Sequence, residues 1–138
     1  NDELHYTRNR IRHQVLPAWR EAFDAADDML ARSARHAAQA QSLLQELAQL
    51  DWVLVGPSPS IQQLQTLSPA RQANVLRYWL AQHHHTQASD AQLQALLQQV
   101  AACTTRGHRI ELKVGHGFVV RKAEALVFVK QRPPVVND

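Results

Sequence analysis

The sequence predicts a mostly α-helical fold, in which a long connecting helix leads to a small helical bundle and a short antiparallel three-stranded β-meander forms the C-terminal end. Composition is the first observation: 45% of the 138 residues are hydrophobic but only 6% are aromatic, and the abundant Leu, Ala and Gln favour helix over strand. Periodicity is the second, because apolar residues recur every three or four positions before Gly107 and every two positions after it. A chain of this length can bury one core.

The N-terminal third is expected to be helical. Residues 6–16 predict a short helix ending near Pro17, which either kinks a continuing helix or begins a new one. An apolar stripe then predicts one helix as far as about Leu50, with packed ends and a thinly covered centre of Ala and Ser. The stripe consists of Leu16, Trp19, Phe23, Ala26, Leu30, Ser33, Ala37, Ala40, Leu44 and Leu47.

Loop and capping signals divide the middle of the chain. Glycine and prolines at 56–60 break the helical pattern, and a short apolar segment follows at 61–67. The Ser-Pro pair at 68–69 predicts the start of a helix that runs to about Gln82. Its expected core side consists of Ala73, Leu76, Tyr78, Trp79 and Leu80, with Arg71 and Arg77 on other faces.

A further helix is expected to begin at Ser89, because Gln92 three residues later completes a capping box. Gly107 is expected to follow the end of this helix. The residues predicted to be buried along it are Leu93, Leu96, Leu97 and Val100.

Three strands are expected at the C-terminal end. Ile110, Leu112 and Val114 alternate with Glu111 and Lys113, as in a half-buried strand. A glycine-rich turn should then lead to further strands at 118–121 and 125–129, which complete the meander, and Arg132-Pro133-Pro134 should end the fold as a linker.

Charge is uneven along the chain, although the net charge is only +3. Both ends are basic, over residues 1–20 and 103–138, and the middle is mildly acidic. If the protein binds a polyanion, the ends are therefore the expected contacts. No apolar run is long enough for a membrane span.

The sequence shows no catalytic or metal-binding constellation. The single cysteine, Cys103, cannot form an internal disulfide and is expected to be a small buried hydrophobic residue. Three consecutive histidines, His83-His84-His85, cannot all point one way, so we expect a solvated helix end rather than a metal site. With four glycines in all, the chain also has no phosphate-binding loop.

A basic motif near the N-terminus is the strongest candidate for ligand binding. On a helix, Arg8 and Arg12 share a face and Asn9 lies beside them. Two guanidinium groups so placed can hold phosphate or carboxylate through paired hydrogen bonds. The alternative is a solvated basic helix end.

The same motif resembles a family signature. Residues 6–17 form the pattern Tyr-x-Arg-Asn-x-Ile-Arg-x-x-Val-Leu-Pro, whose fixed positions are Tyr6, Arg8, Asn9, Ile11, Arg12, Val15, Leu16 and Pro17. This pattern is similar to the motif that closes the catalytic domain of bacterial tRNA(Ile)-lysidine synthetase, also called synthase. Asn1 resembles the last residue of a preceding Asp-x-Ser-Asn element. The resemblance covers nearly the whole chain, through the Ser68-Pro69-Ala70-Arg71 and Arg77-Tyr78-Trp79-Leu80 stretches to Leu126-Val127-Phe128-Val129.

The resemblance implies a division of the chain. Residues 1–17 would close an N-terminal ATP-binding domain, residues 18–50 would form the connecting helix, and residues 51–130 would be the tRNA substrate-binding domain. Residues 131–138 would link to a further C-terminal domain. Because the family's ATP loop is absent from this sequence, the fragment alone is expected to be inactive, with no catalytic residue of its own.

The implied activity belongs to the parent enzyme. It uses ATP with Mg²⁺ to adenylate the wobble cytidine of tRNA(Ile) with a CAU anticodon, and lysine then displaces AMP from the C2 position, so that AUG decoding becomes AUA decoding. By resemblance, Arg8, Asn9 and Arg12 would hold substrate or nucleotide phosphate. The candidate tRNA contacts are Arg71, Arg77, Arg106, Arg109, Lys113, Arg121 and Lys122, with His108 beside them.

A different class of function is the alternative: a helical protein-interaction or dimerisation module without catalytic activity, using the apolar stripe. Binding to RNA should weaken steeply with salt, whereas an apolar interface should not. A DNA-binding domain is disfavoured because no helix combines a basic face with helix-turn-helix spacing. We expect a cytoplasmic protein, whose oligomeric state the sequence leaves open, a dimer included.

Overall fold

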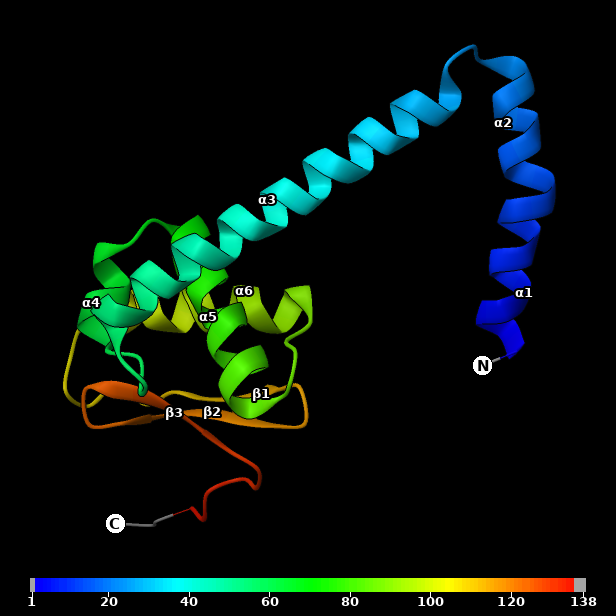
Figure 1. The fold of residues 1–138 in the computed structure, drawn as a ribbon. Coiled ribbons are helices and arrows are strands. Elements are labelled where there is room, and N and C mark those ends of the chain that lie inside the picture. Colours follow the sequence, from blue (N-terminus) through cyan, green and yellow to red (C-terminus); the bar gives the residue numbers. More distant parts are fainter. Residues whose placement is uncertain (1, 136–138) are drawn as a thin grey trace. The chain divides into compact units, whose positions relative to one another are not determined.

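The computed structural model describes residues 2–135, and the chain divides into two compact units, residues 1–42 and 43–138. The expected role of Asn1 lies outside the described residues. The elements are α1 (Asp2–Arg10), the π-helical turn η1 (Ile11–Val15), α2 (Leu16–Ala22), α3 (Ala26–Val55), α4 (Ile61–Thr66), α5 (Pro69–His84), α6 (Asp90–Ala102), β1 (Glu111–Val114), β2 (Gly117–Lys122) and β3 (Ala125–Val129) (Figure 1). The predicted helical fold with a C-terminal meander is confirmed. Among the described helices, none combines the length and apolar character needed to cross a membrane.

The first unit corrects the expected course of the N-terminal helices. Pro17 lies in the first turn of α2, but α2 follows η1 without a break, since Val15 and Leu16 both have right-handed helical backbone. The helix expected to end near Pro17 therefore continues to Ala22. The single helix expected from the stripe is wrong at its start, because Phe23 adopts extended backbone and Ala25 has a φ of 60°. Arg20 and Asp27 form an ion pair of 2.6 Å across this break. The new helix, α3, begins at Ala26 and continues beyond Leu50 to Val55.

The expected packing at the beginning of the stripe is also wrong within this chain. Trp19 and Phe23 contact each other with ring centroids 4.7 Å apart, yet they remain 37% and 51% exposed. Ala26 is the only fully buried residue described in the first unit. Burial of apolar surface therefore contributes little to the stability of this unit by itself.

Three short helices of the second unit begin where serine side chains cap them. The hydroxyl oxygens of Ser60, Ser68 and Ser89 accept hydrogen bonds from backbone N–H groups three residues later, and Gln92 completes the predicted capping box. Helix α6 ends at Ala102, earlier than Gly107 suggested. The reason is that the Gln65 amide donates to the carbonyl oxygens of Val100 and Cys103, each at 2.9 Å, and so terminates the helix from outside.

The sheet is an antiparallel meander in the order β1-β2-β3. Val119 at its centre pairs with Leu112 on one side and with Phe128 on the other. The loop before α4 extends the pairing, since Leu126 N–H donates to the Pro59 carbonyl oxygen at 2.9 Å. Sequence periodicity predicted all three strands to within one or two residues.

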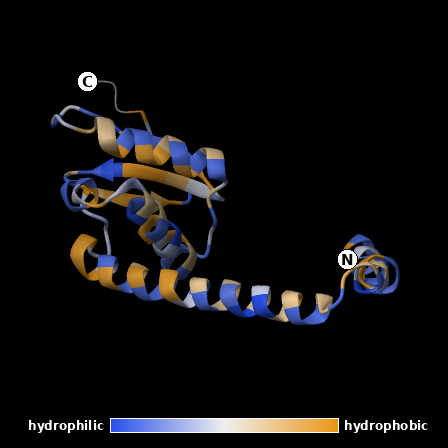
Figure 2. Ribbon diagram, turned by 90° about the horizontal axis from the view of Figure 1, so that it is seen from above, coloured by the Kyte–Doolittle hydropathy of each residue, from blue (hydrophilic) through white to orange (hydrophobic). Residues whose placement is uncertain are grey.

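The core lies between the helices of the second unit and this sheet. Trp79 is fully buried, together with Leu64, Leu76, Leu80, Leu93, Leu96, Val100, Val114, Val119 and Leu126. Of the residues predicted for the core side of α5, only Tyr78 is half-buried rather than buried. Figure 2 shows that the hydrophobic residues of α3 concentrate toward its C-terminal end, where Val55 joins the core while Leu50 and Val53 stay exposed.

Candidate functional site

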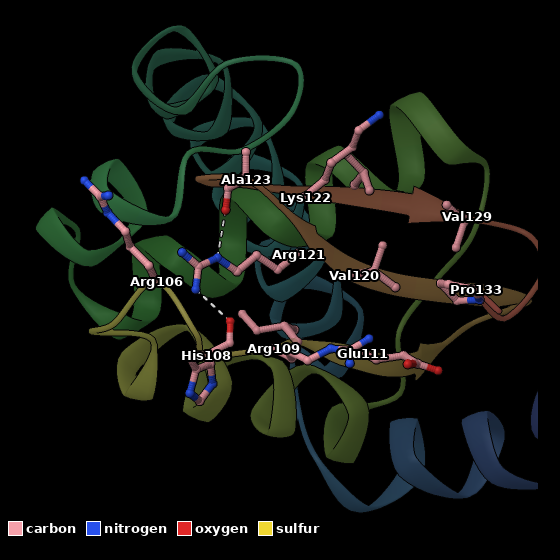
Figure 3. Close-up of a pocket in the computed structure, with 12 residues that line it drawn as sticks. Arg106, His108, Arg109, Glu111, Val120, Arg121, Lys122, Ala123, Val129 and Pro133 are labelled. Atoms are coloured by element: carbon pink, nitrogen blue, oxygen red, sulfur yellow. Dashed lines mark hydrogen bonds between the residues drawn. The ribbon is translucent and has the colours of Figure 1, made fainter. Parts of the chain in front are cut away.

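The basic loop between α6 and β1 is held in place by one arginine of the sheet. Arg121, on β2, donates from Nη1 to the carbonyl oxygens of Thr105 and His108, at 2.8 and 2.7 Å, and from Nε to that of Ala123 at 2.7 Å. Figure 3 shows its guanidinium pointing at the carbonyl oxygens of Ala123 and His108. The Arg121 side chain is only 9% exposed, and Glu124 lies 3.8 Å away. A planar, five-donor group suits this task because it can satisfy several carbonyls at once.

A shallow cavity of about 800 Å³ opens beside this loop. Arg106 and Arg109 from the loop and Lys122 from β2 line it, and none of the three side chains has a hydrogen bond or ion pair to another described residue. Glu111 also lines the cavity, but its carboxylate accepts a 2.6 Å hydrogen bond from Arg132. Three exposed, unpaired cations therefore face a surface whose one carboxylate is already paired, an arrangement that attracts anions.

His108 supports the same loop rather than standing free. Its Nε2 lies 3.0 Å from the Gln99 amide oxygen, and its backbone N–H donates to Thr105. Because the ring is fixed on α6 and the carbonyl oxygen on Arg121, the backbone that carries Arg106 and Arg109 is anchored on both sides.

The other candidate contacts on the second unit lie outside this cavity. Lys113 is on β1, with its ammonium 5.0 Å from the centre of the Phe118 ring. Arg77 is exposed and lies 3.9 Å from the still more exposed Asp90, a weak pairing that leaves its charge available.

Arg71 has a different partner. It forms a two-point contact with Asp51, a residue of α3 that is 1% exposed, and this hydrogen bonding and the charge of Asp51 raise the pKa of Arg71 above its ordinary value. Sequence reasoning missed this pair because the two residues stand twenty positions apart and no local pattern links them. The half-exposed Arg71 side chain is thus committed to a buried carboxylate.

The N-terminal motif lies in the first unit and is exposed except at the half-buried Leu16. The Asn9 amide nitrogen lies 3.3 Å from His5 Nε2, and Asn9 lines a small cavity of about 190 Å³ with Tyr6 and His13. Arg8 and Arg12 do not line that cavity. Arg12 belongs to the π-helical turn η1, which sequence patterns did not predict.

No three His, Cys, Asp or Glu side chains within residues 2–135 gather as a metal site would require. The histidine run is only partly the solvated helix end that was expected. His83 and His85 are exposed, whereas His84 is half-buried against aromatic rings. Cys103 is buried and free, as predicted.

Comparison with known proteins gives a consistent result. Residues 60–127 match the family described as the TilS substrate binding domain. The chain is 56% identical over 128 residues to a tRNA(Ile)-lysidine synthase of Polaromonas naphthalenivorans, which covers 93% of the chain and 39% of that protein. The synthase of Coxiella burnetii is 34% identical over 125 residues (85% and 28%), and that of Enterobacter sp. (strain 638) is 33% identical over 142 residues (100% and 33%). The chain therefore spans well under half the length of these relatives.

Proposed function

We propose that this chain, which belongs to the tRNA(Ile)-lysidine synthase family, forms the tRNA-binding part of an enzyme that ligates lysine to tRNA(Ile) with a CAU anticodon. The bond would form at the C2 position of the wobble cytidine after adenylation by ATP. The observation that carries the proposal is the cavity with three unpaired cations, Arg106, Arg109 and Lys122. All three lie within the segment that matches the substrate binding domain.

The cavity suits the backbone of folded RNA. Guanidinium groups offer paired N–H donors to phosphate oxygens, and a lysine adds a mobile positive charge. Paired RNA is recognised mainly through its shape, its phosphates and its ribose hydroxyls, so cations on a fixed frame are the required chemistry. Arg121 would provide that frame by fixing the loop, and Arg77 and Lys113 would extend the positive surface around it.

Arg71 would act differently from the other candidates. Because its guanidinium is engaged by Asp51, we propose that it stabilises the fold and contacts RNA only through its exposed edge. Arg8, Asn9 and Arg12 are proposed to hold a phosphate of the substrate or nucleotide from the first unit. The comparisons favour a function in the tRNA(Ile)-lysidine synthase family over a helical protein-interaction module.

Catalysis is proposed to require regions of the enzyme beyond the 39% that this chain spans in its relative from Polaromonas. ATP, Mg²⁺ and lysine would bind there, because the described residues here offer neither a phosphate loop nor a group of metal ligands. On this proposal, the 138-residue chain binds tRNA but has no ligase activity by itself, and it works in the cytoplasm.

The direct test is binding of the chain to the CAU-anticodon tRNA(Ile), beside elongator methionine tRNA, across a series of salt concentrations. Arg106→Ala/Arg109→Ala should weaken binding and reduce the slope of log affinity against log salt by about 2, since each lost phosphate contact removes about one unit. Arg32→Ala/Arg35→Ala, which removes the same charge from exposed positions on α3, is the matched control. Equal effects of the two double variants, or no binding at low salt, would contradict the proposal.

A further inference from the structure

A second cavity of the second unit is lined almost entirely by side chains that can carry positive charge. It measures about 320 Å³ and is formed by His83, His84, His85, His116, Phe128 and Lys130. We call it the histidine cavity. None of the residues of the Arg106 cavity lines it, and the proposed function leaves it without a role.

The end of α5 supplies three of the imidazoles in fixed positions. His83 stacks on Trp52 with ring centroids 4.2 Å apart and planes only 8° from parallel. His84 lies between two rings, 5.1 Å from Trp79 and 4.9 Å from Phe128. His85 ends the helix in the left-handed region, with a φ of 50°, so the chain reverses direction there. The three neighbours therefore point apart but border one space.

His116 is brought to the same space from the turn between β1 and β2. Its backbone N–H donates to the Thr86 hydroxyl at 3.1 Å, and Gly115 N–H donates to the Gln92 side chain at 3.2 Å. Gly115 has a φ of 57°, and a Cβ there would lie 1.9 Å from the Thr86 hydroxyl oxygen, so only glycine permits this close approach. The turn is thus fastened to the segment just after α5.

The His116 ring meets Phe128 edge-on at 5.5 Å, on the ring that also contacts His84. The Phe128 ring therefore contacts two imidazoles whose positions in the sequence are more than thirty residues apart. Backbone hydrogen bonds hold the turn that carries His116, so these side chains have fixed positions, as binding sites require.

Five of the six described residues that line the cavity can carry positive charge, and none of the six is a carboxylate. The end of α5 contributes His83, His84 and His85, the β1–β2 turn contributes His116, and Lys130 follows β3. From α3, the uncharged Trp52 stacks on His83 without lining the cavity. Burial first, and then repulsion from His83 and His85, lower the pKa of His84. An anion in the cavity would offset that repulsion, so its binding and protonation of the histidines should favour each other.

We infer that the histidine cavity binds a phosphate group of the tRNA backbone and does so more strongly as the pH falls. The inference rests on the proposed function and adds a second contact to the one at Arg106 and Arg109. Protonated imidazoles and an ammonium group donate hydrogen bonds to phosphate oxygens without accepting any. RNA fits better than an acidic peptide, because the His83 ring, backed by Trp52, gives an adjoining base a flat surface for stacking.

The test uses the whole 138-residue chain and two probes, inorganic phosphate and the CAU-anticodon tRNA(Ile). Imidazole resonances of His84 and His116 are followed by NMR through a pH titration, with and without phosphate. Phosphate should shift both resonances and raise both pKa values. Binding of the tRNA is then compared at pH 6 and pH 8, where a pKa shift of one unit on binding corresponds to about a tenfold gain in affinity at the lower pH.

His85→Gln/His116→Gln changes two exposed imidazoles of the cavity, keeps Lys130 in place and should flatten this pH dependence. His36→Gln, an exposed histidine on α3, is the control that should retain it. Resonances that ignore both probes, or an unchanged pH profile in the double variant, would overturn the inference.

The outcomes separate this inference from the proposed function. Binding that depends on Arg106 and Arg109 but not on the histidines would overturn the inference alone. No binding of tRNA at either pH would overturn both. Polyglutamate is added as a third probe in the same titration. If it shifts the His84 and His116 resonances while phosphate and tRNA do not, the cavity would bind an acidic protein and the RNA contact would be contradicted.

Discussion

Arg71 holds the buried carboxylate of Asp51 by two hydrogen bonds, one from Nε to Oδ2 at 3.2 Å and one from Nη2 to Oδ1. The pair joins α5 to α3 within the second unit, and Asp51 is 1% exposed. A carboxylate so deeply placed needs this partner, because an unpaired buried charge is strongly unfavourable.

Arg71→Ala should therefore lower the free energy of unfolding, measured with urea, far more than Arg77→Ala, whose partner Asp90 is fully solvated. Arg71→Lys should lie between them, since lysine keeps the charge but cannot make the two-point contact. Equal stability of the Arg71→Ala and Arg77→Ala variants would show that Asp51 is not held as described.

Ser89→Ala should cost about 1 kcal/mol of stability, because the Ser89 hydroxyl caps α6 by accepting from Gln92 N–H at 3.1 Å. Gln92→Leu should cost more. Its side-chain oxygen accepts from both Ser89 and Gly115, so two backbone donors lose their partner at once. Urea unfolding of the two single variants, with exposed Gln98→Leu as the control, checks the order.

Arg121 and Arg106 should separate stability from binding. Arg121→Ala removes the donor to three carbonyl oxygens and should cost about 1–3 kcal/mol of stability. Arg106→Ala, which breaks no hydrogen bond in the described chain, should leave the unfolding midpoint unchanged while lowering the salt dependence of tRNA binding. If Arg106→Ala destabilised the chain as much as Arg121→Ala, the assignment of loop stabilisation to Arg121 and of RNA binding to Arg106 would be wrong.

His84 should make the folded state sensitive to acid. Its pKa in the folded chain is lowered from the ordinary value of 6.5, first by burial and then by its histidine neighbours. The unfolded chain therefore takes up a proton first, so this contribution to stability is fully present above pH 6.5 and is lost as the pH falls toward the lowered value.

Unfolding in phosphate-free buffer between pH 5 and pH 8 measures this loss. His84→Gln should reduce the slope of stability against pH, and His36→Gln should not, because His36 is exposed. A slope unchanged by His84→Gln would assign the acid sensitivity to other groups.

Local signals in the sequence predicted much of the fold. Serine caps and the change of period after Gly107 placed α5, α6 and the meander, because these features depend on residues within a few positions of one another. The break at Phe23–Ala25 was missed, since the apolar spacing continues through it and neither glycine nor proline marks it.

Contacts between residues far apart in the sequence could not be predicted either, because no local pattern marks them. The sequence identified a basic C-terminal region, but it could not distinguish Arg121, whose guanidinium is consumed by backbone carbonyls, from Arg106 and Arg109, which remain unpaired. The sequence also could not predict that His84 and His116 would both contact the ring of Phe128. Only the folded meander brings these three residues together.

The Arg121 side chain on β2 fixes the path of the loop that carries Arg106 and Arg109. The side chains at positions 106 and 109 are therefore not needed to hold the loop backbone in place. Substitutions there change charge and reach while the fold stays the same. We expect this surface to tolerate sequence drift and redesign one residue at a time, each step nearly neutral for folding, provided that Arg121 is kept. The ligand preference of this surface can therefore change in evolution without a change in the fold.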